Sequence, residues 1–320
     1  MKKVFINAII PKIGIDILKK NKIRVIRNNS YLPIAKSELI KKAKDCDAII
    51  SLLINKIDSS IIDKIPNLKI ISNYAAGYNN IDIRHASSKG IWVTNTPDVL
   101  TNATADVAFG LMIACARRFR EADIFTRKGK FKIWQSDLML GKELYRKNLG
   151  IIGTGRIGKA VAKRAYGFGM NIFYNNLERN LPLEIELKAK SLPLNKLLST
   201  CDFISIHTPL TPKTYHLIDK KNFDRMKNGV VLINTSRGEV IDEKALVQAL
   251  KSGKLFSAGL DVYEFEPKIT KELLKFESVI LLPHIGSATE EARNKMAEIA
   301  AQNVVNVLSG KKPITPVNNL

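Results

Sequence analysis

A glycine turn in the middle of the chain constrains the fold more than any other feature. The stretch LGIIGTGRIG (149–158) places Gly153, Gly155 and Gly158 directly after a strand-like apolar run. A helical stretch, GKAVAKRAYGFG, and another apolar run, NIFYN, follow it. In such a strand-turn-helix unit, the glycine backbone and the helix N-terminus hold the pyrophosphate of a dinucleotide. We therefore predict dinucleotide binding here, the alternative being a tight turn without a ligand.

Length favours two domains, and the composition is that of a soluble globular protein. The chain has 320 residues, 45% hydrophobic and 25% charged, and single cores rarely grow beyond roughly 250 residues. The apolar run AFGLMIACA (108–116) is shorter than the roughly 18 residues of a membrane span. The start, MKKVFINAII, has no small-residue cleavage site after it, so it reads as a first strand rather than a signal peptide.

The three cysteines suggest a reducing, cytoplasmic location. Cys46, Cys115 and Cys201 are widely separated and form no metal-binding or redox pair. The chain has only four histidines, so we expect no metal site.

The net charge of +21 is the unusual bulk property. The 51 Lys and Arg residues are scattered, with short clusters such as RKGKFK (127–132) and no long basic block. We therefore expect neither nucleic-acid nor membrane binding. A positive field still attracts small anionic substrates and phosphorylated cofactors.

Short apolar runs alternate with helical stretches along both halves of the chain, which predicts parallel sheets covered by helices. The expected strands are 3–10, 23–28, 47–53, 68–75 and 90–96, then, beyond the glycine turn, 171–175, 202–208, 230–236, 256–263 and 278–284. The expected helices include 34–44, 56–65, a long one within 97–118, and a final one at about 289–309 that packs back on the first domain.

The end of the strand NIFYN bears on the choice of cofactor. Enzymes that prefer NAD(H) usually place an acid there, on the adenosine ribose diol. This chain has Asn175 and Asn176 instead, then Glu178 and Arg179. The missing acid and the nearby Arg179 favour NADP(H); Glu178 reaching back to the ribose is the NAD(H) alternative.

Four stretches together carry a family resemblance. LGIIGTGRIG, INTSRGEVID (233–242), GLDVYEFEP (259–267) and LLPHIGSAT (281–289) resemble the D-isomer-specific 2-hydroxyacid dehydrogenases. NYAAGYNNIDI (73–83), NTPDVLTNATADVAF (95–109) and the ending GKKPITPVN are most similar to the glyoxylate/hydroxypyruvate reductase branch. The resemblance runs in order along nearly the whole chain.

The resemblance implies two doubly wound parallel-sheet domains, Rossmann-like and flavodoxin-like, with one inserted into the other. Residues 1–98 and 285–320 would form the substrate domain, and residues 99–284 the dinucleotide-binding domain. The glycine turn comes late because the substrate domain starts first and is completed last. The family likeness also implies a homodimer, chiefly through the helix at 103–118 and the loop containing Trp134.

The implied reaction is NAD(P)H-dependent reduction of glyoxylate or hydroxypyruvate to glycolate or D-glycerate. Arg237 ends the strand VVLINTS, where its guanidinium can grip a carboxylate and polarise a carbonyl. Glu266 beside His284 would stabilise the protonated imidazole, which can then act as general acid. The resemblance assigns these three residues as the catalytic set.

Further site residues are expected at strand ends and in loops. Substrate contacts are assigned to Arg237, Ser287, Leu53, Trp134, and the backbone N–H groups of Ala76 and Gly77. Cofactor contacts are assigned to Thr104, Gly153, Gly155, Arg156, Ile157, Gly158, Asn175, Asn176, Arg179, His207, Thr208, Pro209, Thr214, Thr235, Ser236, Asp261 and Gly286. Asp261 would hold the nicotinamide carboxamide. His85 and His216 are taken as ordinary surface histidines.

Two other functions remain open. One is another member of the family, such as a phosphoglycerate dehydrogenase, although the chain has no room for the C-terminal regulatory domain that many of those carry. The other is a non-enzymatic, NAD(H)-sensing scaffold similar to the family's transcriptional corepressors. The positive charge favours the scaffold, and the complete set of Arg237, Glu266 and His284 favours an enzyme.

Overall fold

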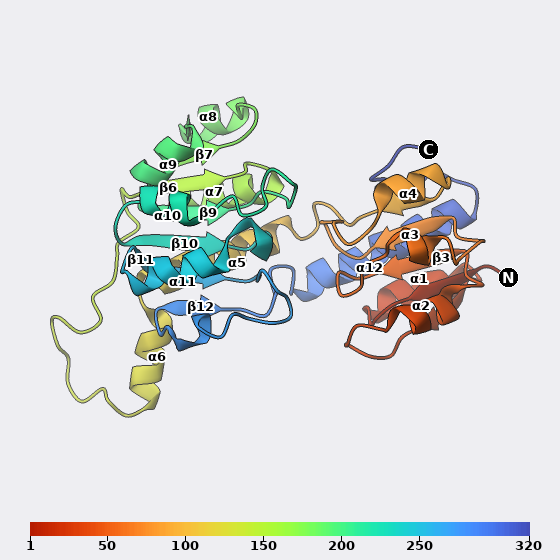
Figure 1. Ribbon diagram of the computed structural model, residues 1–320, viewed down its shortest axis with the longest axis horizontal. Helices are drawn as coiled ribbons and strands as arrows, with labels where there is room; N and C mark the ends of the chain where they lie inside the picture. The colour runs from red at the N-terminus through yellow and green to blue at the C-terminus, as the bar shows by residue number, and fades with distance from the viewer. The chain divides into compact units, whose positions relative to one another are not determined.

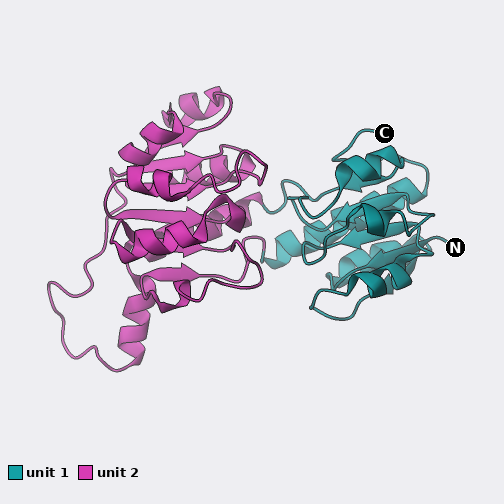
Figure 2. Cartoon of the chain, in the orientation of Figure 1, with its two compact units in different colours: residues 1–100, 288–320 teal, residues 101–287 magenta.

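The chain builds one parallel sheet, continues into a second, and returns with a helix that packs on the first. The computed structural model describes residues 1–320. Unit 1 comprises residues 1–100 and 288–320, and unit 2 comprises residues 101–287 (Figure 2). Both expected parallel-sheet α/β folds are confirmed (Figure 1).

Unit 1 has a five-stranded parallel sheet in the order β2-β1-β3-β4-β5, the order of flavodoxin-like folds. Its strands are β1 (Lys3–Ile6), β2 (Arg24–Arg27), β3 (Ala48–Ser51), β4 (Ile70–Asn73) and β5 (Trp92–Thr94). Its helices are α1 (Lys12–Lys20), α2 (Lys36–Ala43), α3 (Ser59–Ile62), α4 (Ile83–Ser88) and α12 (Glu290–Leu308). Side chains of α2, α3 and α4 share one apolar cluster with Phe5, Ile49 and Ile71.

The returning helix α12 packs on this first sheet, as expected. It contacts α1 and strands β3, β4 and β5. A Cβ atom on Gly14 of α1 would lie 2.9 Å from the carbonyl oxygen of Ala297 in α12. The two helices therefore meet backbone to backbone, which only glycine at position 14 permits.

Unit 2 has a seven-stranded parallel sheet in the order β12-β11-β10-β9-β6-β7-β8. This is the dinucleotide-binding arrangement with one strand added, and the strand order reverses between β6 and β9. Its strands are β6 (Asn148–Ile152), β7 (Asn171–Asn175), β8 (Lys190–Ser191), β9 (Phe203–Ile206), β10 (Val230–Asn234), β11 (Leu255–Leu260) and β12 (Val279–Leu281). Its helices are α5 (Thr101–Ala116), α6 (Phe119–Arg127), α7 (Arg156–Gly167), α8 (Leu181–Leu187), α9 (Leu194–Thr200), α10 (Lys220–Arg225) and α11 (Glu243–Lys251), with short 3₁₀ turns at Gly238–Val240 and Leu273–Lys275.

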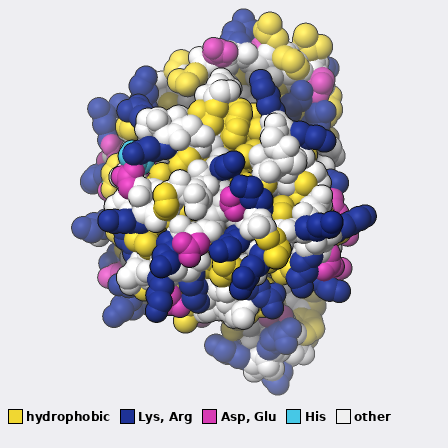
Figure 3. Space-filling model, turned by 90° about the vertical axis from the view of Figure 1, so that its right-hand side faces the viewer, with side chains coloured by type: hydrophobic (Ala, Val, Ile, Leu, Met, Phe, Trp, Pro, Cys, Tyr) yellow, Lys and Arg dark blue, Asp and Glu magenta, His cyan; other side chains and the backbone are white.

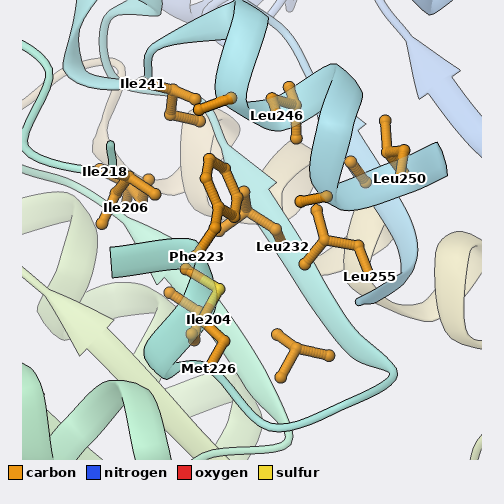
Figure 4. Close-up of a cluster of buried hydrophobic side chains, with 14 of the residues drawn as sticks. Ile204, Ile206, Ile218, Phe223, Met226, Leu232, Ile241, Leu246, Leu250 and Leu255 are labelled. Carbon is orange, nitrogen blue, oxygen red and sulfur yellow. The ribbon is translucent and has the colours of Figure 1, made fainter. Parts of the chain in front are cut away.

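Two apolar clusters hold the helices of unit 2 to its sheet. One joins α5, α7 and α8 to buried strand residues such as Tyr174 and Phe203. The other joins α9, α10 and α11 to the sheet, and Figure 4 shows Phe223 at its centre. The sheet is thus covered on both faces, which explains why its strands are continuous apolar runs.

The face drawn in Figure 3 carries its positive charge diffusely. On the face in Figure 3, Lys and Arg side chains alternate with hydrophobic, acidic and neutral polar ones. Many cations are paired with nearby acids, for example Lys2 with Asp47 at 2.7 Å. None of the helices is both long and apolar enough to cross a bilayer.

Replacing Gly14 with leucine tests the close packing of α1 on α12. Gly14→Leu should lower the melting temperature by at least about 3 °C, because overpacking a helix contact typically costs about 1–3 kcal/mol. Lys19→Leu, at an exposed position of the same helix, is the matched control and should change it little. Equal melting temperatures for both variants in a thermal unfolding scan would contradict this account.

Candidate active site of unit 2 and the loops of unit 1

The glycine turn lies where the strand order of unit 2 reverses. Gly153 has φ +92°, and a Cβ atom there would lie 2.8 Å from the carbonyl carbon of His207, which follows β9. A Cβ atom on Gly158 would lie 2.1 Å from the oxygen of Gly153. Gly155, at the N-cap of α7, has open space around its Cβ position. Two glycines therefore close the turn and the third leaves it open to a ligand.

Two buried hydroxyls at the same edge of the sheet lack partners. Thr154 lies within the turn and Thr235 follows β10, and the side-chain oxygen of each makes no hydrogen bond within the protein. Unsatisfied buried polar atoms are costly, so such a pair suits a ligand that brings its own hydrogen-bonding groups. Together with the open glycine turn, these hydroxyls fit a dinucleotide.

The end of β7 has no carboxylate, as the sequence indicates, but its polar side chains are already engaged. Asn175 donates to the carbonyl oxygen of Leu192 at 2.9 Å, and Asn176 donates to that of Glu178 at 3.1 Å. The guanidinium of Arg179 is paired with Glu184 of α8. This pair is not among the contacts predicted from the sequence.

The predicted cofactor residues after β9 and β10 form ordered turns. His207 hydrogen-bonds Ser205 at 2.8 Å, and burial lowers its pKa to about 3, so its imidazole is neutral. The hydroxyl of Thr214 donates to the carbonyl oxygen of Pro209 at 2.7 Å. The hydroxyl of Ser236 donates to Asn234 at 2.8 Å.

Asp261, which follows β11, binds the segment after β12. Its two oxygens accept the N–H groups of Ile285 and Gly286, each at 2.7 Å. Burial raises the pKa of Asp261, and these two N–H groups oppose that rise. A Cβ atom on Gly286 would lie 3.1 Å from Asp261 and 3.2 Å from Thr104 of α5, so these predicted cofactor residues adjoin one another.

The structure brings Arg237, Glu266 and His284 together. His284 Nδ1 lies 3.0 Å from Glu266 Oε2, and the other oxygen of Glu266 accepts the Tyr263 N–H at 3.1 Å. Burial alone would raise the pKa of Glu266, but the hydrogen bond and charge of His284, the Tyr263 N–H and the charge of Arg237 lower it overall. Burial lowers the pKa of Arg237, while the charges of Glu239 and Glu266 act in the opposite direction. The site thus combines one fixed cation with a hydrogen-bonded acid and imidazole.

A close backbone contact keeps Arg237 near Glu266. A Cβ atom on Gly238 would lie 1.8 Å from the carbonyl carbon of Tyr263, so the turn after Arg237 rests directly on the segment leading to Glu266. Any side chain at position 238 would force the two segments apart.

A carboxylate network holds the Glu266 segment from the other side. Glu264 lies 2.8 Å from His216 and accepts the Glu243 N–H at 3.0 Å, while Glu243 accepts the Glu264 N–H at 2.9 Å. Thr270 also donates to Glu243. The side chain of His216, interpreted from the sequence as an ordinary surface histidine, is 30% exposed, paired with Glu264 and stacked on Tyr215 with the ring centroids 4.1 Å apart. His85 is ion-paired with Asp63 at 2.9 Å.

The predicted substrate residues of unit 1 lie in loops beyond β3 and β4. Leu53 follows β3, and Ala76 and Gly77 follow β4. The carbonyl oxygen of Ala76 accepts from Asn95, and that of Gly77 from Asn73, each at 2.7 Å. The N–H groups of Ala76 and Gly77 make none of the backbone hydrogen bonds that hold this loop.

Buried asparagines connect these two loops. Asn73 is fully buried and bonds Asn80 at 3.2 Å, and Asn80 also donates to the carbonyl oxygens of Leu52 and Asn55 at 3.4 Å. The sequence predicts the AAGYNN loop as a substrate-binding loop but does not indicate this carboxamide network. The remaining predicted residues, Ser287 and Trp134, belong to unit 2, and Trp134 is 77% exposed.

Removing one carboxamide tests how the unit 1 loops are held. Asn73→Ala should reduce the free energy of unfolding by about 1–3 kcal/mol, because it leaves buried partners such as Asn80 unsatisfied. Chemical denaturation measures this, with Asn29→Ala at an exposed position of the same unit as control. If Asn73→Ala unfolds at the same denaturant concentration as Asn29→Ala, the network does not stabilise the loops.

Comparisons with known proteins agree with this arrangement. Residues 109–286 match the model of the D-isomer specific 2-hydroxyacid dehydrogenase NAD binding domain. A glyoxylate reductase of Thermococcus gammatolerans is 47% identical, over 99% of this chain and 96% of the relative.

Solved structures give the same picture. A glyoxylate reductase from Paecilomyes thermophila superposes with a TM-score of 0.89 at 34% identity, over 99% of this chain and 98% of that one. An NADPH-dependent glyoxylate/hydroxypyruvate reductase from Sinorhizobium meliloti, in complex with NADP and malonate, has a TM-score of 0.89 at 30% identity, over 99% and 96%. The chain belongs to the D-isomer specific 2-hydroxyacid dehydrogenase family.

Proposed function

We propose that this protein reduces small 2-oxo acids, glyoxylate and hydroxypyruvate, to the corresponding D-2-hydroxy acids with a nicotinamide cofactor. The observation that carries the proposal is the 3.0 Å pair of His284 and Glu266, with Arg237 close enough to lower the pKa of Glu266. The names of the glyoxylate reductase relatives support this substrate class.

In this proposal, Arg237 binds the substrate carboxylate and polarises the 2-oxo group. Glu266 engages His284 through Nδ1, so Nε2 is the nitrogen that gives a proton to the oxygen of the developing alkoxide. The Glu266 carboxylate orients the imidazole and stabilises its protonated form. The bound nicotinamide supplies the hydride. In the reverse direction, His284 takes the proton from the hydroxy acid.

The residues that would hold the cofactor line the carboxyl edge of the unit 2 sheet. We assign its pyrophosphate to the glycine turn and the start of α7, with Arg156 and Ile157, and its polar groups to the unpartnered hydroxyls of Thr154 and Thr235. The other predicted contacts, namely Thr104, His207, Thr208, Pro209, Thr214, Ser236, Asp261 and Gly286, belong to the same proposal. NADP(H) is the proposed preference, supported by the absence of a carboxylate at the end of β7.

Further substrate contacts complete the proposal. The N–H groups of Ala76 and Gly77 would bind the substrate carboxylate, Leu53 and Trp134 would shape the space for its side chain, and Ser287 would lie beside His284.

A cytoplasmic location is supported by Cys46, Cys115 and Cys201, which are buried free thiols.

The reaction is tested by following NADPH and NADH oxidation at equal concentrations, with glyoxylate and separately with hydroxypyruvate. We expect oxidation with both substrates, faster with NADPH. His284→Ala should lower kcat by about 10²- to 10⁴-fold with little change in the Kd of NADPH, since it removes the proton donor alone. Arg237→Ala should mainly raise the KM of the 2-oxo acid.

Near-normal turnover of His284→Ala would reject the assigned proton donor. Activity only with a different 2-oxo acid would assign the protein another substrate within the family. Cofactor binding without oxidation of any 2-oxo acid would favour the corepressor-like scaffold, for which a salt-dependent shift of nucleic acid on a gel is the further check.

We also propose a homodimer formed through unit 2. Helices α5 and α7 border a groove of about 450 Å³ whose apolar lining includes Phe109, Ile113 and Phe168. The loop after α6 exposes large apolar side chains, including Ile133 at 68% and Trp134 at 77%. Exposed apolar surface of this kind marks protein interfaces.

Light scattering after size exclusion tests the dimer. The wild type should have about twice the chain mass of 35.7 kDa. Phe168→Glu should shift the equilibrium towards monomer, because it puts a charge in the apolar groove. Tyr31→Glu, at an exposed position of unit 1, should leave the mass unchanged. A monomeric wild type would reject the proposal.

A further inference from the structure

Arg179 of unit 2 is positioned to influence the choice of cofactor, and the carboxylate of Glu184 holds its side chain. Arg179 follows β7 closely and its side chain is 69% exposed, whereas that of Glu184 is only 15% exposed. Two nitrogens of the guanidinium face the two oxygens of Glu184, with Nε 3.1 Å from Oε1. The carboxylate therefore occupies the side of the guanidinium that binds anions bidentately.

Glu184 is itself anchored in the unit. It accepts a hydrogen bond from the hydroxyl of Tyr174, a fully buried residue of β7. The same hydroxyl accepts the N–H of Asn180 at 2.8 Å. The hydrogen bond of Arg179, followed by that of Tyr174, lowers the pKa of Glu184, so its carboxylate is charged at neutral pH.

Asn180 connects this group to the glycine turn. Its amide nitrogen donates to the carbonyl oxygen of Thr154 at 3.1 Å, and its oxygen accepts the N–H of Leu183 at the start of α8. Arg179 and Glu184 are thus held next to the turn assigned to the pyrophosphate, on the side of β7 where dinucleotide-binding folds place the adenosine ribose.

We propose that Glu184 competes with the 2′-phosphate of NADP(H) for Arg179 and thereby limits the preference of the protein for NADP(H) over NAD(H). The inference rests on the proposed function, since it assumes that a dinucleotide binds at the glycine turn. It adds that Glu184 of α8 determines how readily Arg179 can bind the 2′-phosphate.

The competition follows from charge and geometry. A guanidinium that already pairs bidentately with a carboxylate must release or share it to bind a phosphate in the same way. The two anions also repel each other at close range. NAD(H) has a neutral hydroxyl at this position and gains little from Arg179. Neutralising Glu184 should therefore favour NADP(H) selectively.

The test measures dissociation constants of NADPH and NADH by titration calorimetry for two single variants and their double variant. Glu184→Gln keeps an acceptor for Tyr174 and removes the charge; it should tighten NADPH about two- to fivefold, the contribution of one exposed ion pair, and change NADH less than twofold. Arg179→Met should weaken NADPH selectively. In the Arg179→Met background, Glu184→Gln should no longer change the NADPH-to-NADH affinity ratio.

Glu186→Gln is the matched control. Glu186 lies on the same helix but pairs with Lys159 at 3.7 Å and Lys163 at 3.1 Å, so its removal changes the net charge equally without freeing Arg179. It should leave the affinity ratio unchanged. Thermal unfolding of each variant shows whether it keeps the fold.

Three results would overturn the inference: an unchanged or lower affinity ratio in Glu184→Gln, an equal rise in Glu186→Gln, or the same rise without Arg179. A wild type that prefers NADH, with a ratio raised by Glu184→Gln, supports the role of Glu184 and rejects only the proposed NADP(H) preference. Absence of binding of either dinucleotide to the wild type rejects both proposals.

Discussion

Parallel strand pairing determines where this chain can place its chemistry. All seven strands of the unit 2 sheet end at one edge, so the residues that follow them gather there although they are far apart in sequence. The glycine turn follows β6, His207 follows β9, Arg237 follows β10 and His284 follows β12. Crowding at this edge requires backbone contact, and Gly153 and Gly238 provide it against His207 and Tyr263.

Two independent restraints act on His284. Its imidazole is held by Glu266, and the backbone just beyond it is held by Asp261 through the N–H groups of Ile285 and Gly286. His284 itself has φ +56°, in the left-handed region that few non-glycine residues adopt. The carboxylates of Asp261 and Glu266 therefore together fix the position of the His284 imidazole.

The sequence predicted the strands and the residues at their ends, because buried parallel strands are continuous apolar runs and turns follow them. It did not reveal β8, since Lys190–Ser191 is short, exposed and without an apolar pattern. It also did not reveal the partners that hold the site residues. Glu264 and His216 are 48 positions apart, and nothing local to His216 indicates a carboxylate beside it. Such contacts depend on how turns of different strands meet. The Asn180 contact with the glycine turn is of the same kind, although an asparagine just before Leu-Pro is a recognisable helix start.

The asparagine network of unit 1 has a consequence for acid–base behaviour. The groups that tie the Leu53 loop to the Ala76 and Gly77 loop are carboxamides, a hydroxyl and backbone carbonyls, which neither gain nor lose protons near neutral pH. The shape of these loops is therefore insensitive to proton concentration. A pH change across the neutral range leaves these hydrogen bonds between the two loops in place.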